Sequence, residues 1–197
     1  MKIFFLLFFL LFSSLVIADD ISDFQIEGIS IGDSLLDYLS KKEILQEIEI
    51  NKPSYNYLRE EFGEIYLFNG LSKYYSVIFF VKLNDKDYII QGIRGTIDYD
   101  DEKMDDCYNK QEEVINEISP LFKISKKENL IEYYTIDPSG KSKTTYIALT
   151  LKSGDVVTVD CNEWEEKFKL KNNFMNSLVV SLQSKDVNDW LSSERLY

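Results

Sequence analysis

Short apolar segments separated by tight-turn sequences constrain the fold of this chain more than any other feature. Residues 74–83 carry apolar side chains at alternate positions, and the polar segment 84–87 follows them directly. Asp-Pro-Ser-Gly at 137–140 and Ser-Gly-Asp at 153–155 are typical turn sequences. Alternation with a period of two indicates a strand, and tight turns join antiparallel neighbours. The sequence therefore predicts antiparallel β-meanders.

The same reasoning places the other elements. Strands are expected at 21–31, 64–68, 74–83, 88–99, 130–136, 144–151, 156–164 and 178–182. Helices are expected after Ser34, from about 102 to 119 and after Ser184, with a further short turn where Ser40-x-x-Glu43 matches a capping box. We expect an α+β fold with helices packed on one face of the sheet. One arrangement that fits this order is two tandem helix-plus-meander units, 19–101 and 102–197.

The first 18 residues have the layout of a secretory signal peptide. Lys2 precedes the apolar run 3–12, and Val16 and Ala18 occupy the small-residue positions of a cleavage site. The alternative is an uncleaved anchor, for which about 20 apolar residues are needed. We expect cleavage after Ala18, a periplasmic or secreted location, and a single domain over 19–197 with no membrane span.

The chain has two cysteines, and both are expected to point into the core. Cys161 shares a strand face with Val157 and Val159, while Cys107 lies on an apolar helical stripe with Ile118. A pair of cysteines in an exported chain favours one disulfide, Cys107 to Cys161. The alternative is two buried free thiols.

Charge and residue types argue against several classes of partner and reaction. The formal net charge is −12, which disfavours nucleic acid as a partner because its phosphate backbone would be repelled. There is no histidine, the commonest general base and a common metal ligand. We therefore expect no catalytic residues of the usual kinds, no metal site and no cofactor.

Gly32-Asp33-Ser34-Leu35 resembles the nucleophile block of GDSL esterases and lipases. The resemblance implies that Ser34 is a nucleophile, but that family takes the serine proton with a histidine that this chain lacks. A serine hydroxyl without a base is a weak nucleophile. The alternative is that Asp33 or Ser34 caps a helix.

Carboxylates are densest between residues 98 and 106. Calcium binds such oxygens, but the EF-hand template fails because Lys103 stands at its glycine position and Asn109 at its final glutamate position. The alternative is a helix start, where acidic residues are favourable. A carboxylate pair for sugar hydrolysis stays open.

Tyrosines are numerous, and some could line a ligand or partner face, because tyrosine is enriched at interfaces. The candidates are Tyr55, Tyr57, Tyr74, Tyr133 and Tyr134. The alternative is that these rings fill strand faces.

The composition is rich in Lys, Ile, Asn and Tyr. With this composition, the chain resembles the small exported, uncharacterised proteins of AT-rich marine bacteria of the Pelagibacter type. The segments that carry the resemblance are 29–35, the helix around Cys107, Val159-Asp160-Cys161 and Asp189-Trp190-Leu191. That resemblance implies no known activity.

From the sequence we expect a periplasmic binding or protein-interaction module without catalytic activity, whose partner is an envelope protein or a small ligand. Two alternatives stay open: a small-ligand carrier with an aromatic-lined pocket, and a carboxylate-dependent envelope hydrolase. A pocket lined by aromatic residues would favour the carrier, and two acids facing each other across a cleft would favour the hydrolase.

Overall fold

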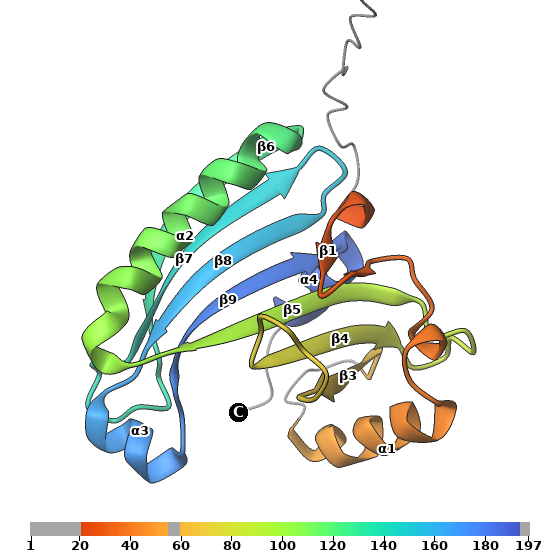
Figure 1. Cartoon of the computed structure of the whole chain (residues 1–197), viewed down its shortest axis with the longest axis horizontal. Helices are drawn as coiled ribbons and strands as arrows, with labels where there is room; N and C mark the ends of the chain where they lie inside the picture. The colour runs from red at the N-terminus through yellow and green to blue at the C-terminus, as the bar shows by residue number, and fades with distance from the viewer. Residues whose placement is uncertain (1–20, 55–59, 194–197) are drawn as a thin grey trace, which may run out of the picture.

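One seven-stranded antiparallel sheet organises the molecule (Figure 1). The computed structural model describes residues 21–54 and 60–193, so the signal-peptide prediction for 1–18 lies outside the described residues. The strands of the sheet are β3 (Phe62–Leu67), β4 (Ser76–Lys82), β5 (Ile90–Tyr99), β6 (Ile124–Tyr133), β7 (Lys143–Leu151), β8 (Val156–Glu163) and β9 (Asn176–Gln183). The predicted α+β fold with antiparallel meanders is confirmed.

Two meanders meet in the middle of this sheet. The strand order is β3-β4-β5-β9-β8-β7-β6, so the last strand of the chain lies between the two groups. β9 pairs with β5 on one side, with Arg94 opposite Ser181, and with β8 on the other, with Asp160 opposite Val179. The two expected helix-plus-meander units therefore share one continuous sheet.

The larger core lies on one face of the sheet. It is covered by α1 (Lys41–Asn51), α2 (Met104–Ile118) and a small hairpin, β1 (Gln25–Ile26) and β2 (Ile29–Ser30). The Cys107 sulfur on α2 and the Cys161 sulfur on β8 are 2.04 Å apart in a disulfide bond. Both cysteines are fully buried, so the predicted bond links the main helix to the centre of the sheet.

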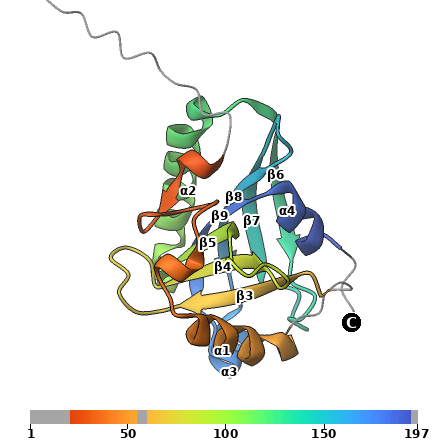
Figure 2. The same ribbon diagram turned by 90° about the vertical axis from the view of Figure 1, so that its right-hand side faces the viewer.

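α4 (Lys185–Leu191) packs on the opposite face, so not every helix lies on the expected side. Figure 2 shows α2 and α4 on either side of the sheet. Val187 and Trp190 of α4 pack against Phe62, Ile78 and Phe80 in a second apolar cluster. The reason is that β4 is apolar on both faces: Phe79 faces the larger core, whereas Ile78 and Phe80 face α4.

Two local predictions were wrong about helices. Ser34 starts only a single 3₁₀ turn, Leu35–Asp37, because the amide of Leu35 donates to the carbonyl of Tyr88 and ties this segment to the sheet. The longer helix is α1, which begins after the capping box of Ser40 and Glu43.

The remaining short elements complete the chain. α3 (Glu166–Asn172), between β8 and β9, was not predicted; unlike α4, it has no fully buried residue and so presents no core-facing apolar stripe. Further 3₁₀ turns are Ile21–Asp23, Lys52–Ser54, Asp101–Lys103 and Ser119–Leu121. Within 21–54 and 60–193, no helix has the length and apolar character needed to cross a bilayer.

Candidate ligand site

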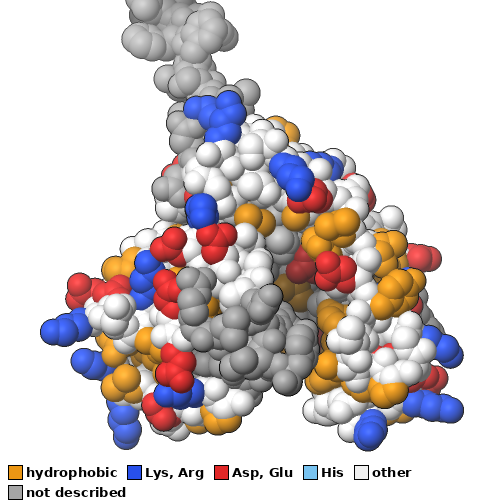
Figure 3. Space-filling model, turned by 180° about the vertical axis from the view of Figure 1, so that it is seen from behind, with side chains coloured by type: hydrophobic (Ala, Val, Ile, Leu, Met, Phe, Trp, Pro, Cys, Tyr) orange, Lys and Arg blue, Asp and Glu red, His pale blue; other side chains and the backbone are white. Residues whose placement is uncertain are grey.

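A hollow of about 610 Å³ lies on the sheet face that carries α4. α4 covers the β3–β5 part of this face, and the β6–β8 part beside it is open. We call this space the sheet hollow; Figure 3 shows the molecule from this side, hollowed near its centre with acidic side chains at the rim. Its floor is formed by alternate residues of β6, β7 and β8, and one wall by Asn188, Leu191 and Ser192 at the end of α4.

Alternation along the strands explains why this surface is polar. On β8, Val157, Val159 and Cys161 are buried in the larger core, so the residues between them point to the other face. Those residues include Thr158 and Asp160, which line the sheet hollow. The same strand therefore contributes to the core and to the floor of the candidate site.

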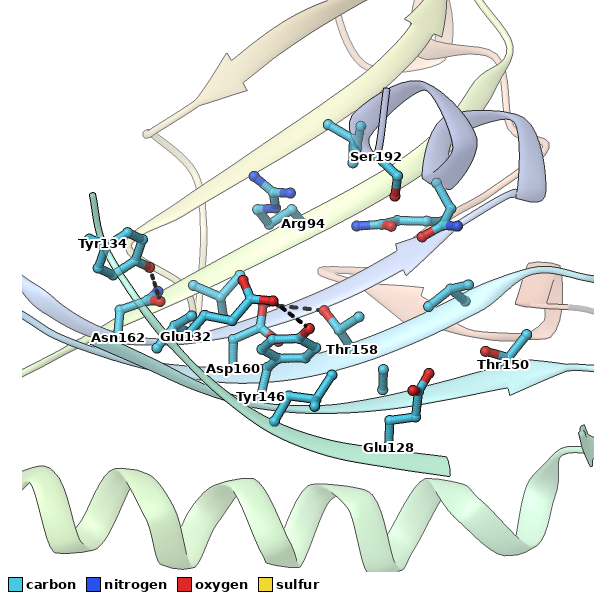
Figure 4. Close-up of a pocket in the computed structure, with 18 residues that line it drawn as sticks. Arg94, Glu128, Glu132, Tyr134, Tyr146, Thr150, Thr158, Asp160, Asn162 and Ser192 are labelled. Atoms are coloured by element: carbon cyan, nitrogen blue, oxygen red, sulfur yellow. Dashed lines mark hydrogen bonds between the residues drawn. The ribbon is translucent and has the colours of Figure 1, made fainter. Parts of the chain in front are cut away.

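Two carboxylates, Asp160 and Glu132, lie together on this floor (Figure 4). The Thr158 hydroxyl donates to Asp160 Oδ2 over 3.2 Å, and the Tyr146 hydroxyl donates to Glu132 Oε1 over 3.0 Å. Asp160 Oδ1 is buried and has no hydrogen-bond partner within the described part of the chain. A buried carboxylate oxygen without a donor is costly, so its retention in the fold calls for an explanation.

Burial raises the pKa of Asp160 to about 6, against 3.8 for an ordinary aspartate. The positive charge of Arg94 and the Thr158 hydrogen bond act in the opposite direction, and the nearby charge of Glu132 raises the pKa further. Asp160 therefore changes its charge near neutral pH.

Arg94 enters the sheet hollow from β5. Its Nε donates to the Ser181 hydroxyl over 3.3 Å, and the guanidinium lies 5.4 Å from the centre of the Phe80 ring. Among the described residues Arg94 makes no ion pair. The electrostatic influence of Arg94 on Asp160 is thus exerted across the hollow rather than through a direct contact.

Aromatic packing fixes one end of the site. The Tyr134 hydroxyl donates to Asn162 Oδ1 over 2.6 Å, and the Tyr134 ring stacks on Trp164 with 4.2 Å between centroids. Trp164 in turn packs against Phe168 of α3 and Phe174. Burial raises the pKa of Tyr134 to about 12, so its hydroxyl stays protonated.

The predicted tyrosines do not form a single surface. Tyr134 lines the sheet hollow, whereas Tyr74 packs against the larger core, where a Cβ added at Gly95 would come within 2.6 Å of its ring. Tyr133 is 63% exposed on β6. Tyr55 and Tyr57 lie outside the described residues. A ligand or partner face at these tyrosines stays a prediction.

The other sequence candidates have structural roles. Ser34 donates to the carbonyl of Asp87 over 2.7 Å and accepts from the amide of Leu36, as expected for a cap. In the acidic stretch, Asp100 pairs with Lys103 over 2.7 Å and Asp101 accepts from the Asn176 amide over 2.8 Å. No three His, Cys, Asp or Glu residues gather as a metal site anywhere in the described ranges.

Four residues that line the sheet hollow are not predicted as site residues from the sequence: Arg94, Glu132, Tyr146 and Asp160. One available signal was the acid of Asp160 between two core residues of a strand, Val159 and Cys161, which places it on the face opposite the core. Asp160 lies on β8 and Arg94 on β5. The two strands come close only through the sheet order, in which β9 alone lies between them.

Comparison of the chain with protein-family models, with curated proteins and with solved structures gives no match.

Proposed function

We propose that this protein is an exported binding module without catalytic activity, and that the sheet hollow is where it binds a small polar ligand. The observation that carries the proposal is the convergence of polar side chains on an open sheet face, where the buried Asp160 Oδ1 finds no donor among the residues that the structure describes. Folded proteins pair nearly all such atoms, so an unpaired one calls for an explanation, and a functional role is one such explanation.

Three features support this proposal. The volume of the hollow, about 610 Å³, is within the usual range for small-molecule sites. Its lining is mostly polar and open to solvent, which favours a polar ligand over an apolar one held in a closed cavity. The Cys107–Cys161 disulfide supports export to an oxidising compartment, periplasmic or extracellular.

A substitution that fills the hollow tests the proposal. Ala148 lines the floor from β7, and Ala148→Trp would occupy the space while leaving the larger core unchanged. We expect at least one member of a panel of amino acids, amines, organic acids and sugars to raise the melting temperature of the wild type. A ligand at a hundred times its Kd adds about 2.7 kcal/mol of stability, equivalent to roughly 5–10 °C for a domain of this size.

The same ligand should not stabilise the Ala148→Trp variant, whose melting temperature without ligand shows whether it has folded. The proposal is contradicted if no member of the panel stabilises the wild type, or if the variant responds as strongly as the wild type does.

A carboxylate-dependent hydrolase is the second candidate, because Asp160 can hold a proton near neutral pH and Glu132 lies beside it. A general acid with a raised pKa next to an ionised carboxylate is the arrangement that glycosidases use. Turnover of a glycan substrate by the wild type, lost in Asp160→Asn, would favour this function over simple binding. Ligand-induced stabilisation without turnover favours the binding module.

A further inference from the structure

We infer that the ligand of the sheet hollow is a zwitterion, an amino acid or short peptide, whose ammonium group binds at Asp160 and whose carboxylate binds at Arg94. This inference rests on the proposed function and narrows it to a chemical class. It is carried by two opposite charges, those of Arg94 and Asp160, that line one hollow without a hydrogen bond or an ion pair between them.

The acidic end provides acceptors in a shielded position. Asp160 Oδ1 is buried and lacks a donor, and the Glu132 carboxylate accepts only the Tyr146 hydroxyl among the described residues. An ammonium group carries three donors and a positive charge, so it can bond to a carboxylate oxygen that faces the hollow and attract both carboxylates through its charge. Ammonium binding would also offset the repulsion between Asp160 and Glu132.

The basic end provides donors that the described residues do not use. Within the described part of the chain, only the Nε of Arg94 has a hydrogen-bond partner, the Ser181 hydroxyl, and the two terminal nitrogens of the guanidinium have none. Phe80 supports the guanidinium from its ring face. A planar guanidinium with free terminal nitrogens matches a carboxylate, which it can bind through two parallel hydrogen bonds.

The balance of charge in the hollow agrees with a ligand whose ammonium group lies at Asp160 and whose carboxylate lies at Arg94. Glu128, Glu132 and Asp160 line the hollow together with Arg94. Glu128 is paired with Lys126 over 2.8 Å, and the two other acids still outnumber Arg94, so a simple anion would meet more repulsion than attraction. A simple amine would leave Arg94 without a counter-ion. A ligand that carries both charges satisfies both ends.

A matched set of probes tests the inference by calorimetric titration. Glycine, glycylglycine and triglycine vary the separation of the two charges and so distinguish an amino acid from a peptide. N-acetylglycylglycine removes the positive charge of glycylglycine, and glycylglycinamide removes its negative charge. We expect at least one zwitterion to bind, and blocking either end to weaken binding roughly tenfold or more, the usual effect of losing a hydrogen bond between charged groups.

Two variants assign the ends. Asp160→Asn keeps the volume and a partner for Thr158 but loses the charge; it should weaken binding of glycylglycine and not of the N-acetyl probe. Arg94→Gln should weaken binding of glycylglycine and not of the amide probe. Glu117→Gln, on the exposed side of α2 across the sheet, is the control and should bind as the wild type does.

Three results would overturn the inference: no zwitterion binding with a Kd below about 1 mM, capped probes binding as tightly as glycylglycine, or Asp160→Asn behaving like Glu117→Gln. If another class of compound binds the wild type and is blocked by Ala148→Trp, the inference fails and the proposed function stands. If nothing binds, both fail.

Discussion

Asp160 combines two properties that are costly for stability. It is a carboxylate on the sheet floor, and one of its oxygens is buried with no donor from residues 21–54 or 60–193. Its opposite neighbours on β7 and β9 are Tyr146 and Val179, and neither gives it a hydrogen bond. Groups kept in such positions are frequent at functional sites, because function and stability make different demands on the same residue.

A denaturation experiment at two pH values tests this property of Asp160. The pKa of Asp160 is about 6 in the folded protein and close to the ordinary 3.8 in the unfolded chain. Between these values the folded state binds more protons, so the contribution of Asp160 to the free energy of unfolding falls as pH rises. In Asp160→Asn this loss is absent.

We therefore expect Asp160→Asn and the wild type to have similar stability near the ordinary aspartate pKa. At about pH 8 the variant should be more stable, by roughly 1–3 kcal/mol for a shift of this direction and size. Urea unfolding measures both. A variant that is less stable than the wild type at the higher pH would contradict the burial of an ionised Asp160.

At the scale of elements, α4 forms both the second apolar cluster and a wall of the sheet hollow. Trp190 is fully buried against Phe62 and Phe80, while Asn188 and Leu191 on the same helix line the hollow. The helix starts at Ser184, whose hydroxyl oxygen accepts from the amide of Val187 over 3.3 Å. The position of the wall thus depends on a short, capped helix.

Removing this cap should weaken the anchoring of α4. Ser184→Ala is expected to lower the free energy of unfolding by about 1 kcal/mol, the usual value for an N-cap serine. Ser184→Thr, which keeps the hydroxyl, is the matched control and should lose much less. Urea unfolding followed by tryptophan fluorescence provides the measurement. Equal stability of the alanine and threonine variants would show that the cap contributes nothing.

The strands could be predicted from sequence because their signal is local. Alternation at 74–83 and the turns at 137–140 and 153–155 correspond to β4, to the β6–β7 connection and to the β7–β8 connection. The first helix was misplaced because capping residues occur at both Ser34 and Ser40, and only packing against β5 decides between them. α3 was missed because it has no fully buried residue and its N-cap is Glu165 rather than one of the usual capping residues, whereas α4, of the same length, follows Ser184.

The candidate site could not be predicted from sequence because it is a product of strand order. Glu132, Asp160 and Arg94 lie on β6, β8 and β5, and no spacing along the chain relates them. Their common face depends on β9 inserting between β5 and β8. Charge and alternation along a strand predict on which face of the sheet each side chain lies. They do not predict which side chains from different strands lie close together.

At the scale of the whole molecule, the disulfide holds the layer of α2 on the sheet. Cys107 and Cys161 are 54 residues apart in sequence, and their bond joins α2 to the strand that carries Asp160. Closing a loop of this length restricts the unfolded chain and stabilises the folded protein by about 4 kcal/mol in the chain-entropy model.

Replacing both cysteines should remove that stabilisation. We expect Cys107→Ser with Cys161→Ser to lower the free energy of unfolding by roughly 2–5 kcal/mol. The wild type treated with a reductant should show a similar loss, whereas the double variant should be insensitive to it. A reductant that leaves the wild-type unfolding curve unchanged would be inconsistent with a stabilising bond.

Nuclear magnetic resonance tests most directly whether the ligand binds at the open face of β6–β8. A backbone amide spectrum of the protein is recorded while the best-binding compound of the panel is added. We expect the signals that move to be those of the strands carrying Glu132, Tyr146 and Asp160, together with Arg94 and the end of α4. Movement confined to α1, α2 or the β1–β2 hairpin, on the opposite face, would contradict it.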